Sequence, residues 1–291
     1  MLLFAGGATD SQLGFLIQRA KHRGVLHTTL LHDPGAPLLV NWDLDSGAVR
    51  VGDAEIKADA AFVRQDVFRF LNTKNPTDQS DARSWKILFD GWLMAYPEIR
   101  RFNQSFAMAD AVNKPVALVW AREAGLEIPR TVLHASRDLG AQMLANGPVI
   151  YKPIGGGDEC RPLEKEALDR VKEEHLPRPY IFQECLEAPE LRIYRVGDRF
   201  LGFEIEADAL DYRTVGNAAI IKPVQPPIHL LGPLKKLTDR IGLNFAAADF
   251  KASPNSGALK FLEVNSNPMF AGFDNAADGV LCDAMIDWLT S

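Results

Sequence analysis

Hydrophobic and polar positions in the first hundred residues alternate between strand-like runs and helical spacing. The apolar run MLLFAGG is followed by residues 10–24, where apolar side chains recur three and four residues apart and a glycine ends the pattern. Residues 37–65 predict strands with a hairpin turn at DSG, and residues 82–99 predict a long amphipathic helix. This order predicts a small α/β unit whose open strand ends would suit a ligand.

A second pattern begins near residue 105. Asn113 and Pro115 are typical of a helix start and Gly125 of a helix end, so the residues between them predict a helix. Further apolar runs predict strands, the fourth of them broken by a VGD turn; they cover residues 128–134, 148–157, 180–187, 191–208 and 245–270. The sequence therefore predicts an α+β body whose strands carry charges at irregular places.

The last of these runs, FAAADFKASPNSGALKFLEVNSNPMF, places carboxylates among apolar residues. Asp249 follows small apolar residues, where an unpaired charge is costly. Glu263 and Asn265 lie two residues apart and so share one face of a strand. If the NSG turn brings the two runs together, the three side chains offer the oxygen ligands that magnesium takes. A polar strand face bordering solvent is the alternative, but the apolar neighbours favour metal ligation.

Two lysines stand where an anion would bind. Lys152 precedes three consecutive glycines, Gly155, Gly156 and Gly157, whose unhindered backbone N–H groups can approach a phosphate. A glycine-rich turn beside a lysine that reaches to solvent is an equal alternative. Lys114 begins the helix after residue 113, where the helix dipole favours an anion, although a lone lysine there is more often only solvated.

A predicted strand leaves one unit and enters the next between these features. An exposed edge of such a strand offers backbone groups that can bind an adenine, and it consists of Gln183, Glu184, Cys185 and Leu186. Glu190 then stands where a carboxylate would reach ribose hydroxyls. The alternative is a linker with a solvated glutamate.

Taken in order, these motifs resemble those of the ATP-grasp carboxylate–amine ligases. NKPVALVWAREAGLEIPRT resembles the helix that opens the nucleotide domain, VIYKPIGGG the second lysine with its glycine loop, and QECLEAPEL the adenine-binding hinge. ADF and FLEVNSNP resemble the metal motif. The similarity runs from about Phe106 onward. It implies ATP and Mg²⁺ as cofactors, Glu190 as the ribose ligand, Arg192 in the nucleotide site, and Asp249, Glu263 and Asn265 as metal ligands.

The resemblance also implies a fold and a division of the chain. The expected fold class is α+β, an ATP-grasp fold of two α+β subdomains that clasp ATP, preceded by a small α/β domain. The expected units are an N-terminal domain at 1–104, a central subdomain with the glycine-rich loop at 105–184, and a C-terminal subdomain with the metal site at 185–291.

Two segments resemble particular branches of the superfamily. FVRQDVF is similar to an Arg-x-Asp segment of glutathione synthetases and ribosomal-protein glutamate ligases. LDYRTV is similar to an aromatic–Arg motif of graspetide ligases, which modify ribosomally made peptides, although Tyr212 stands where that motif usually has Trp. The resemblance makes Arg213 a candidate catalytic residue together with Lys152.

The implied reaction joins a carboxylate to an amine through an acyl phosphate and releases ADP and phosphate. Lys114, Lys152 and magnesium would neutralise the triphosphate, and the planar guanidinium of Arg213 would hold the transferred phosphoryl group. An ATP-grasp phosphotransferase would use the same site. A non-catalytic nucleotide-binding module is a further alternative, which the complete set of lysines and metal ligands disfavours.

Composition limits the classes of binding partner and the cellular compartment that we expect. A net charge of -6 gives no reason to expect nucleic acid binding, and no apolar run approaches the roughly 18 residues of a membrane span. The opening residues lack a basic leader. Three scattered cysteines predict free thiols and a cytoplasmic location, and the scattered histidines do not favour zinc. The expected partner is a small-molecule, amino-acid or peptide substrate, with formation of a homo-oligomer left open.

Overall fold

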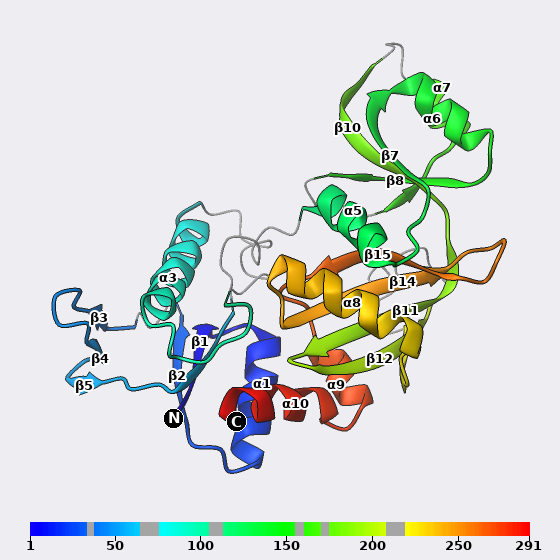
Figure 1. Cartoon of the computed structure of the whole chain (residues 1–291). Helices are drawn as coiled ribbons and strands as arrows, with labels where there is room; N and C mark the ends of the chain where they lie inside the picture. Colours follow the sequence, from blue (N-terminus) through cyan, green and yellow to red (C-terminus); the bar gives the residue numbers. More distant parts are fainter. Residues whose placement is uncertain (34–37, 65–75, 105–112, 155–159, 170–174, 208–218) are drawn as a thin grey trace.

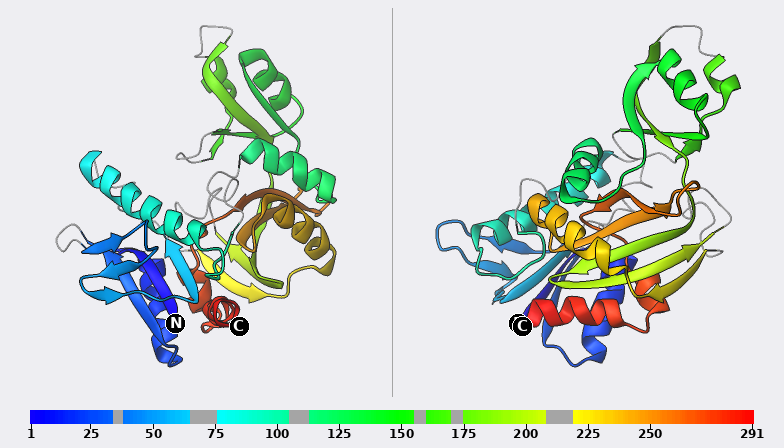
Figure 2. Two further views of the ribbon diagram at one scale, coloured as in Figure 1. Left: turned by 60° about the vertical axis from the view of Figure 1, so that its left-hand side comes forward. Right: turned by 45° about the vertical axis from the view of Figure 1, so that its right-hand side comes forward.

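The structure is a computed structural model that describes residues 1–33, 38–64, 76–104, 113–154, 160–169, 175–207 and 219–291. Its elements form an N-terminal domain, a central lobe that projects from the body, and a C-terminal lobe between the two (Figure 1). The chain ends lie near each other in all three views (Figures 1 and 2).

The N-terminal domain is built on a parallel sheet of order β2-β1-β6. The strands are β1 (Leu2–Gly7), β2 (His27–His32) and β6 (Ala60–Arg64), and the helices are α1 (Ser11–His22) and α3 (Pro76–Ala95). The predicted α/β unit is therefore confirmed. The helix predicted at 82–99 begins and ends a few residues earlier, and the strand β2 was not predicted.

Side chains of β1 alternate between two cores, as the period of a strand requires. Leu2 and Phe4 pack with α1, whereas Leu3 and Ala5 pack with α3. A small antiparallel sheet beside α3 contains β3 (Val40–Trp42), β4 (Val49–Val51) and β5 (Ala54–Glu55), and its β3–β4 connection confirms the DSG hairpin.

The central lobe is an antiparallel sheet of order β7-β10-β8-β9 covered by two short helices. Its elements are β7 (Thr131–Ser136), α6 (Arg137–Leu144), β8 (Val149–Pro153), β9 (Arg161–Pro162), α7 (Lys165–Asp169) and β10 (His175–Glu184). Helix and sheet share a small core of Met143, Val149, Leu163, Leu168 and Phe182. This lobe thus has a core separate from that of the body.

The C-terminal lobe is an antiparallel sheet of order β13-β12-β11-β14-β15. Its strands are β11 (Glu187–Val196), β12 (Arg199–Glu206), β13 (Ile220–Val224), β14 (Phe245–Ala252) and β15 (Leu259–Asn265). Helices cover both faces: α5 (Lys114–Ala124) and α8 (Ile228–Ile241) on one, α9 (Ala271–Ala276) and α10 (Val280–Thr290) on the other.

Helix α5 precedes the central lobe in sequence but packs on the C-terminal sheet. Asn113 caps its start by accepting the N–H of Val116 at 3.2 Å, and Gly125 ends it in the left-handed conformation at φ 102°. Both ends were predicted from these residues. Because α5 shares a core with α8, the central lobe as a packed unit begins after α5; the division at 105 and 185 stays a prediction.

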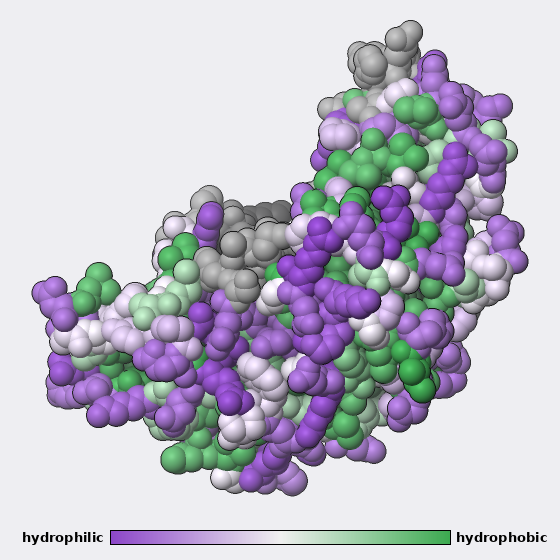
Figure 3. Space-filling model, in the orientation of Figure 1, coloured by the Kyte–Doolittle hydropathy of each residue, from purple (hydrophilic) through white to green (hydrophobic). Residues whose placement is uncertain are grey.

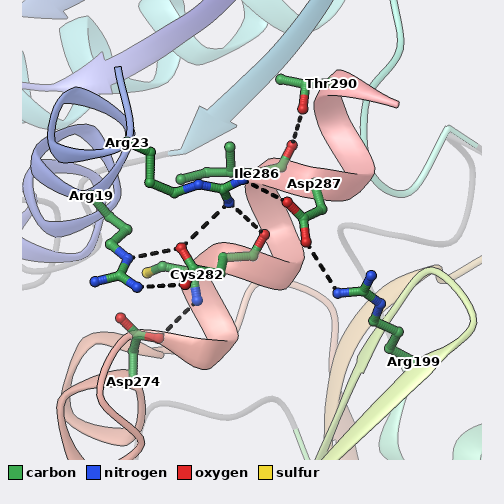
Figure 4. Close-up of polar contacts among 9 residues, drawn as sticks. Arg19, Arg23, Arg199, Asp274, Cys282, Ile286, Asp287 and Thr290 are labelled. Atoms are coloured by element: carbon green, nitrogen blue, oxygen red, sulfur yellow. Dashed lines mark hydrogen bonds and ion pairs between the residues drawn. The ribbon is translucent and has the colours of Figure 1, made fainter. Parts of the chain in front are cut away.

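The N-terminal domain and the C-terminal lobe share one core, which places α10 between them. Ion pairs tie this helix to both sides (Figure 4). The guanidinium Nε of Arg19 on α1 donates to Asp283 Oδ1 at 2.8 Å. Asp287 accepts from Arg23 at 2.7 Å and from Arg199 at 3.2 Å. The two units therefore form one continuous body.

The surface mixes hydrophilic and hydrophobic residues on the face seen in Figure 3. No helix in the described ranges is long and apolar enough to cross a bilayer. Cys160, Cys185 and Cys282 are free thiols, as predicted.

Candidate functional site

Antiparallel pairing of β14 and β15 brings the predicted metal ligands together. Asp249 lies directly opposite Glu263, so the two carboxylates leave the same face of the sheet. Asn265, two residues further on, lies on that face too, and its Nδ2 lies 3.4 Å from Asp249 Oδ2. We call these three side chains the metal face. Their convergence was predicted, and their role as ligands stays a prediction.

Asp249 is buried, and its charge is balanced by Arg192 of the neighbouring strand β11. The guanidinium donates to both carboxylate oxygens, at 2.6 Å and 2.8 Å, and both side chains are less than one-tenth exposed. This two-pronged pair is the geometry that suits arginine and a carboxylate. Arg192, expected in the nucleotide site, therefore contacts the metal face itself.

Both predicted lysines lie near this face. Lys114, the first residue of α5, places its ammonium 3.2 Å from Glu263 Oε2. Lys152 comes from β8 of the central lobe. Burial lowers the pKa of its ammonium, while the nearby charge of Glu263 raises that pKa and the charge of Lys114 lowers it. One lysine from α5 and one from the central lobe thus lie within electrostatic reach of Glu263.

The prediction of an exposed strand edge at residues 183–186 is wrong for its first half. Gln183 and Glu184 belong to β10, which pairs with β8 on one side and with β7 on the other, so their backbone groups are engaged in the sheet. The side chain of Gln183 is fully buried and donates to Thr131 Oγ1 at 2.8 Å. Glu184 forms an ion pair with Lys260 of β15. Strand order, which the local sequence does not carry, makes β10 an inner strand.

Cys185 and Leu186 form the connection between β10 of one sheet and β11 of another, at the place where a crossing between units was expected. The N–H of Cys185 donates to Pro148 O at 2.9 Å, and burial raises the pKa of its thiol. Leu186 is buried. Adenine binding at this connection stays a prediction.

Glu190 lies in a buried ion pair beside the metal face. Its Oε2 lies 3.3 Å from the ammonium of Lys251, and both side chains are 12% exposed. Burial, and then the charge of Asp249, raise the pKa of Glu190 to about 7, although Lys251 and Arg192 oppose this. A carboxyl with such a pKa is typical of functional sites, and its binding to ribose stays a prediction.

Two cations of this region were missed in the sequence. Lys251 lies two residues after Asp249, so the alternation of a strand could have placed it on the same face. Lys260 is three residues before Glu263, and a register shift next to Asp249 hides its relation to the face. Gly155, Gly156, Gly157 and Arg213 lie outside the described residues.

The metal face fits a hard cation by its chemistry. It offers carboxylate oxygens from Asp249 and Glu263 and an amide oxygen from Asn265, the ligand type that magnesium takes while keeping several waters. In the described ranges, no group of three His, Cys, Asp or Glu side chains is placed to hold a metal. Two carboxylates and an amide suit magnesium better than a metal that needs a full cage of protein ligands.

No family model and no curated protein matches the sequence significantly. Solved structures do match it along its whole length. The ATP-grasp ligase PsnB, in complex with a phosphomimetic precursor variant, Mg and ADP, has a TM-score of 0.79 and 24% identity, covering 99% of this chain and 98% of that one. The macrocyclase MdnC from Microcystis aeruginosa MRC, bound with precursor peptide MdnA, has a TM-score of 0.77 and 19% identity, covering 100% of both chains.

A third match is the RiPP-associated ATP-grasp ligase of Chryseobacterium gregarium in complex with ADP and a leader and core peptide. Its TM-score is 0.76 at 18% identity, covering 99% of this chain and 96% of that one. The predicted fold is confirmed: the chain has the α+β ATP-grasp fold.

Proposed function

We propose that this protein is an ATP-dependent carboxylate–amine ligase that acts on a peptide and releases ADP and phosphate. One observation carries the proposal: Lys152 from the central lobe and Lys114 from α5 converge on Glu263, opposite the buried Asp249. Cations placed beside carboxylate ligands at the junction of two ATP-grasp lobes suit a magnesium-bound triphosphate.

The proposed reaction has two steps. A substrate carboxylate oxygen attacks the γ-phosphorus of ATP, the bond to the β-phosphate oxygen breaks, and ADP leaves. An amine nitrogen then attacks the acyl carbon, phosphate departs, and the amine loses a proton as the amide forms. Lys114 and Lys152 would hold the triphosphate through these steps. Magnesium, held by Asp249, Glu263 and Asn265, would neutralise developing charge on the phosphates.

Binding of the triphosphate would change the surroundings of Lys152. Burial disfavours its charged form now, and an anionic phosphate placed against it would favour that form. Lys114 already faces a carboxylate, so the nucleotide would share this cation with Glu263. We assign Gly155, Gly156 and Gly157 to phosphate contact and Arg213 to the transferred phosphoryl group on their resemblance alone.

A peptide substrate is proposed because of the matches. PsnB and MdnC are described with precursor peptides, and the Chryseobacterium gregarium ligase with a leader and core peptide. Because this chain aligns with almost the whole length of those proteins, we propose the same substrate class for it. We also propose the division into 1–104, 105–184 and 185–291, with Glu190 at ribose, and a cytoplasmic location, where ATP is available.

Nucleotide binding is tested first by thermal unfolding with Mg-ATP, Mg-ADP and EDTA. At about 100 times the dissociation constant, a ligand should add roughly 2.7 kcal/mol of stability. Lys152→Met should reduce this shift. Lys235→Met, which removes an exposed lysine from α8 that pairs with Asp239, is the matched control and should not. Absence of any nucleotide shift in the wild type would refute the proposal.

Ligase activity is tested next with short peptides encoded beside the gene. The expected products are ADP and phosphate in equal amounts, together with a peptide that has lost one water per bond formed. A phosphorylated peptide without free phosphate would instead identify a phosphotransferase.

A further inference from the structure

The segment that follows the metal face is held by side chains of the N-terminal domain. We call residues 266–271, which begin directly after Asn265, the clamped loop. Asn103 Nδ2 donates to Ser266 O at 2.9 Å, and Arg64 Nη1 donates to Pro268 O at 3.0 Å. Gln12 Oε1 accepts the N–H groups of residues 270 and 271, each at 2.6 Å. Side chains distant in sequence thus bind its backbone from end to end.

Arg64, at the end of β6, is the central member of this set. It is 1% exposed, and its Nε donates to Asp10 Oδ2 at 3.0 Å. Its Nη1 also donates to the side-chain oxygen of Asn267, and its guanidinium lies 5.8 Å from the ring centre of Phe270. A buried guanidinium requires several partners to offset its desolvation, and here the clamped loop supplies several of them.

The clamp matters because β15 is an edge strand. Among the strands that the structure describes, its neighbour in the sheet is β14, and on its outer side Phe261 N–H donates to Glu127 O at 2.8 Å. At the end that carries Glu263 and Asn265, the pairing Ala247–Asn265 is the last contact of the ladder. Beyond that pair, the position of the strand end depends on the contacts of the clamped loop.

We infer that Arg64 is a positioning residue for the metal face: by fixing Asn267 and Pro268 it holds the end of β15, where Asn265 forms the last pair of the ladder two residues after Glu263. This inference rests on the proposed function, because it takes these side chains as magnesium ligands. Arg64 acts in this inference through its contacts with Asp10 and the clamped loop, and no contact of Arg64 with nucleotide or metal is required. Residues that orient metal ligands typically affect metal affinity by 10- to 100-fold.

The test measures the magnesium concentration that gives half-maximal binding of ADP, by calorimetry, for wild type and variants. Arg64→Lys keeps the charge and loses the planar fork. We expect its magnesium requirement to rise about tenfold. Arg19→Lys is the matched control, because Arg19 makes a similar two-pronged pair with Asp283 between α1 and α10, away from the metal face. The Arg19→Lys variant should have a lower free energy of unfolding and an unchanged magnesium requirement.

A second variant covers the case in which Arg64→Lys does not fold. Asn267→Ala preserves the buried pair of Arg64 with Asp10 and removes one contact of the clamp, so its magnesium requirement should rise above that of the wild type, by less than about tenfold. An unchanged requirement in Asn267→Ala would then overturn the inference. Hydrogen exchange should show faster exchange of the N–H groups of residues 270 and 271 in whichever variant folds.

The outcomes separate the inference from the proposed function. A normal, magnesium-dependent wild type with unchanged requirements in the variants would overturn the inference alone, as would faster exchange of the loop without a change in magnesium requirement. A wild type that binds no ADP at any magnesium concentration would overturn both. If the magnesium requirement rises as much in Arg19→Lys as in Arg64→Lys, the effect is general destabilisation and the inference is also overturned.

Discussion

Glu190 should make the stability of the nucleotide-free protein depend on pH, and Glu190→Gln should remove that dependence. The carboxyl lies in a buried position where burial raises its pKa from 4.5 to about 7. The folded protein therefore holds the proton more tightly than the unfolded chain does. Between these two pKa values the unfolded chain loses its proton first, so the free energy of unfolding falls as the pH rises.

The size of the effect follows from the shift. The rise in the pKa of Glu190 from 4.5 to about 7 corresponds to at most about 3 to 4 kcal/mol, since each pKa unit is worth about 1.4 kcal/mol. The stabilisation is fully present below pH 4.5 and is lost by the time the pH passes about 7. Glutamine has the shape of the protonated carboxyl and can still accept a hydrogen bond from Lys251, so the variant should behave as the low-pH form at every pH.

The measurement is urea unfolding of both proteins at intervals from pH 5 to pH 8, with EDTA and without nucleotide. The unfolding free energy of the wild type minus that of Glu190→Gln at each pH removes the contribution of the other titrating groups, which both proteins share. Wild type should lose up to about 3 kcal/mol relative to Glu190→Gln across this range. Glu123→Gln is the control, because Glu123 pairs with Arg240 on the surface, where solvent screens the charges. A difference that is constant, or that favours wild type at high pH, would refute the reasoning.

Two further changes test the site and the fold. Glu263→Gln should keep the protein folded but raise the magnesium requirement for ADP binding by about tenfold or more, measured by calorimetry; an unchanged requirement would remove Glu263 from the metal face. Gly197→Ala should lower the free energy of unfolding by about 1–3 kcal/mol in urea, because φ is 61° and the added Cβ would overlap the indole ring of Trp288. Gly52→Ala, at a φ of 57° with open space around it, is the matched control and should cost less.

Local sequence signals were sufficient to predict where several elements begin or end. Asn113 and Gly125 bound α5 as predicted because a side-chain cap and a left-handed glycine act within one helical turn. The hairpin between β14 and β15 was predicted for the same reason: its turn residues and the alternation on both sides are contiguous in sequence. The metal face depends on this one hairpin, so the convergence of its three side chains could be predicted from the sequence.

Helices α8 and α10 were not predicted, for different reasons. Helix α8 contains Gly232 and Pro233, which disfavour a helix interior by their intrinsic preferences, and only packing against α5 and the sheet makes it stable. Helix α10 has buried residues around much of its circumference because it lies between the N-terminal domain and the C-terminal sheet. A two-sided burial of this kind weakens the contrast of polar and apolar faces on which sequence patterns depend.

Strand order also determines the partner of Arg192, and this pairing affects the net charge of the site. Among the described residues next to the metal face, the cations Lys114, Lys152 and Arg192 face the carboxylates of Asp249 and Glu263, while Glu190 is paired with Lys251. This cluster carries more positive than negative charge, so a divalent cation alone would meet repulsion, whereas a polyphosphate would be attracted. Metal and nucleotide should therefore favour each other's binding, and the magnesium requirement is meaningful only when it is measured with ADP present. This balance could not be predicted from local sequence, because the register of β11 and β14, which places Arg192 opposite Asp249, is a long-range pairing.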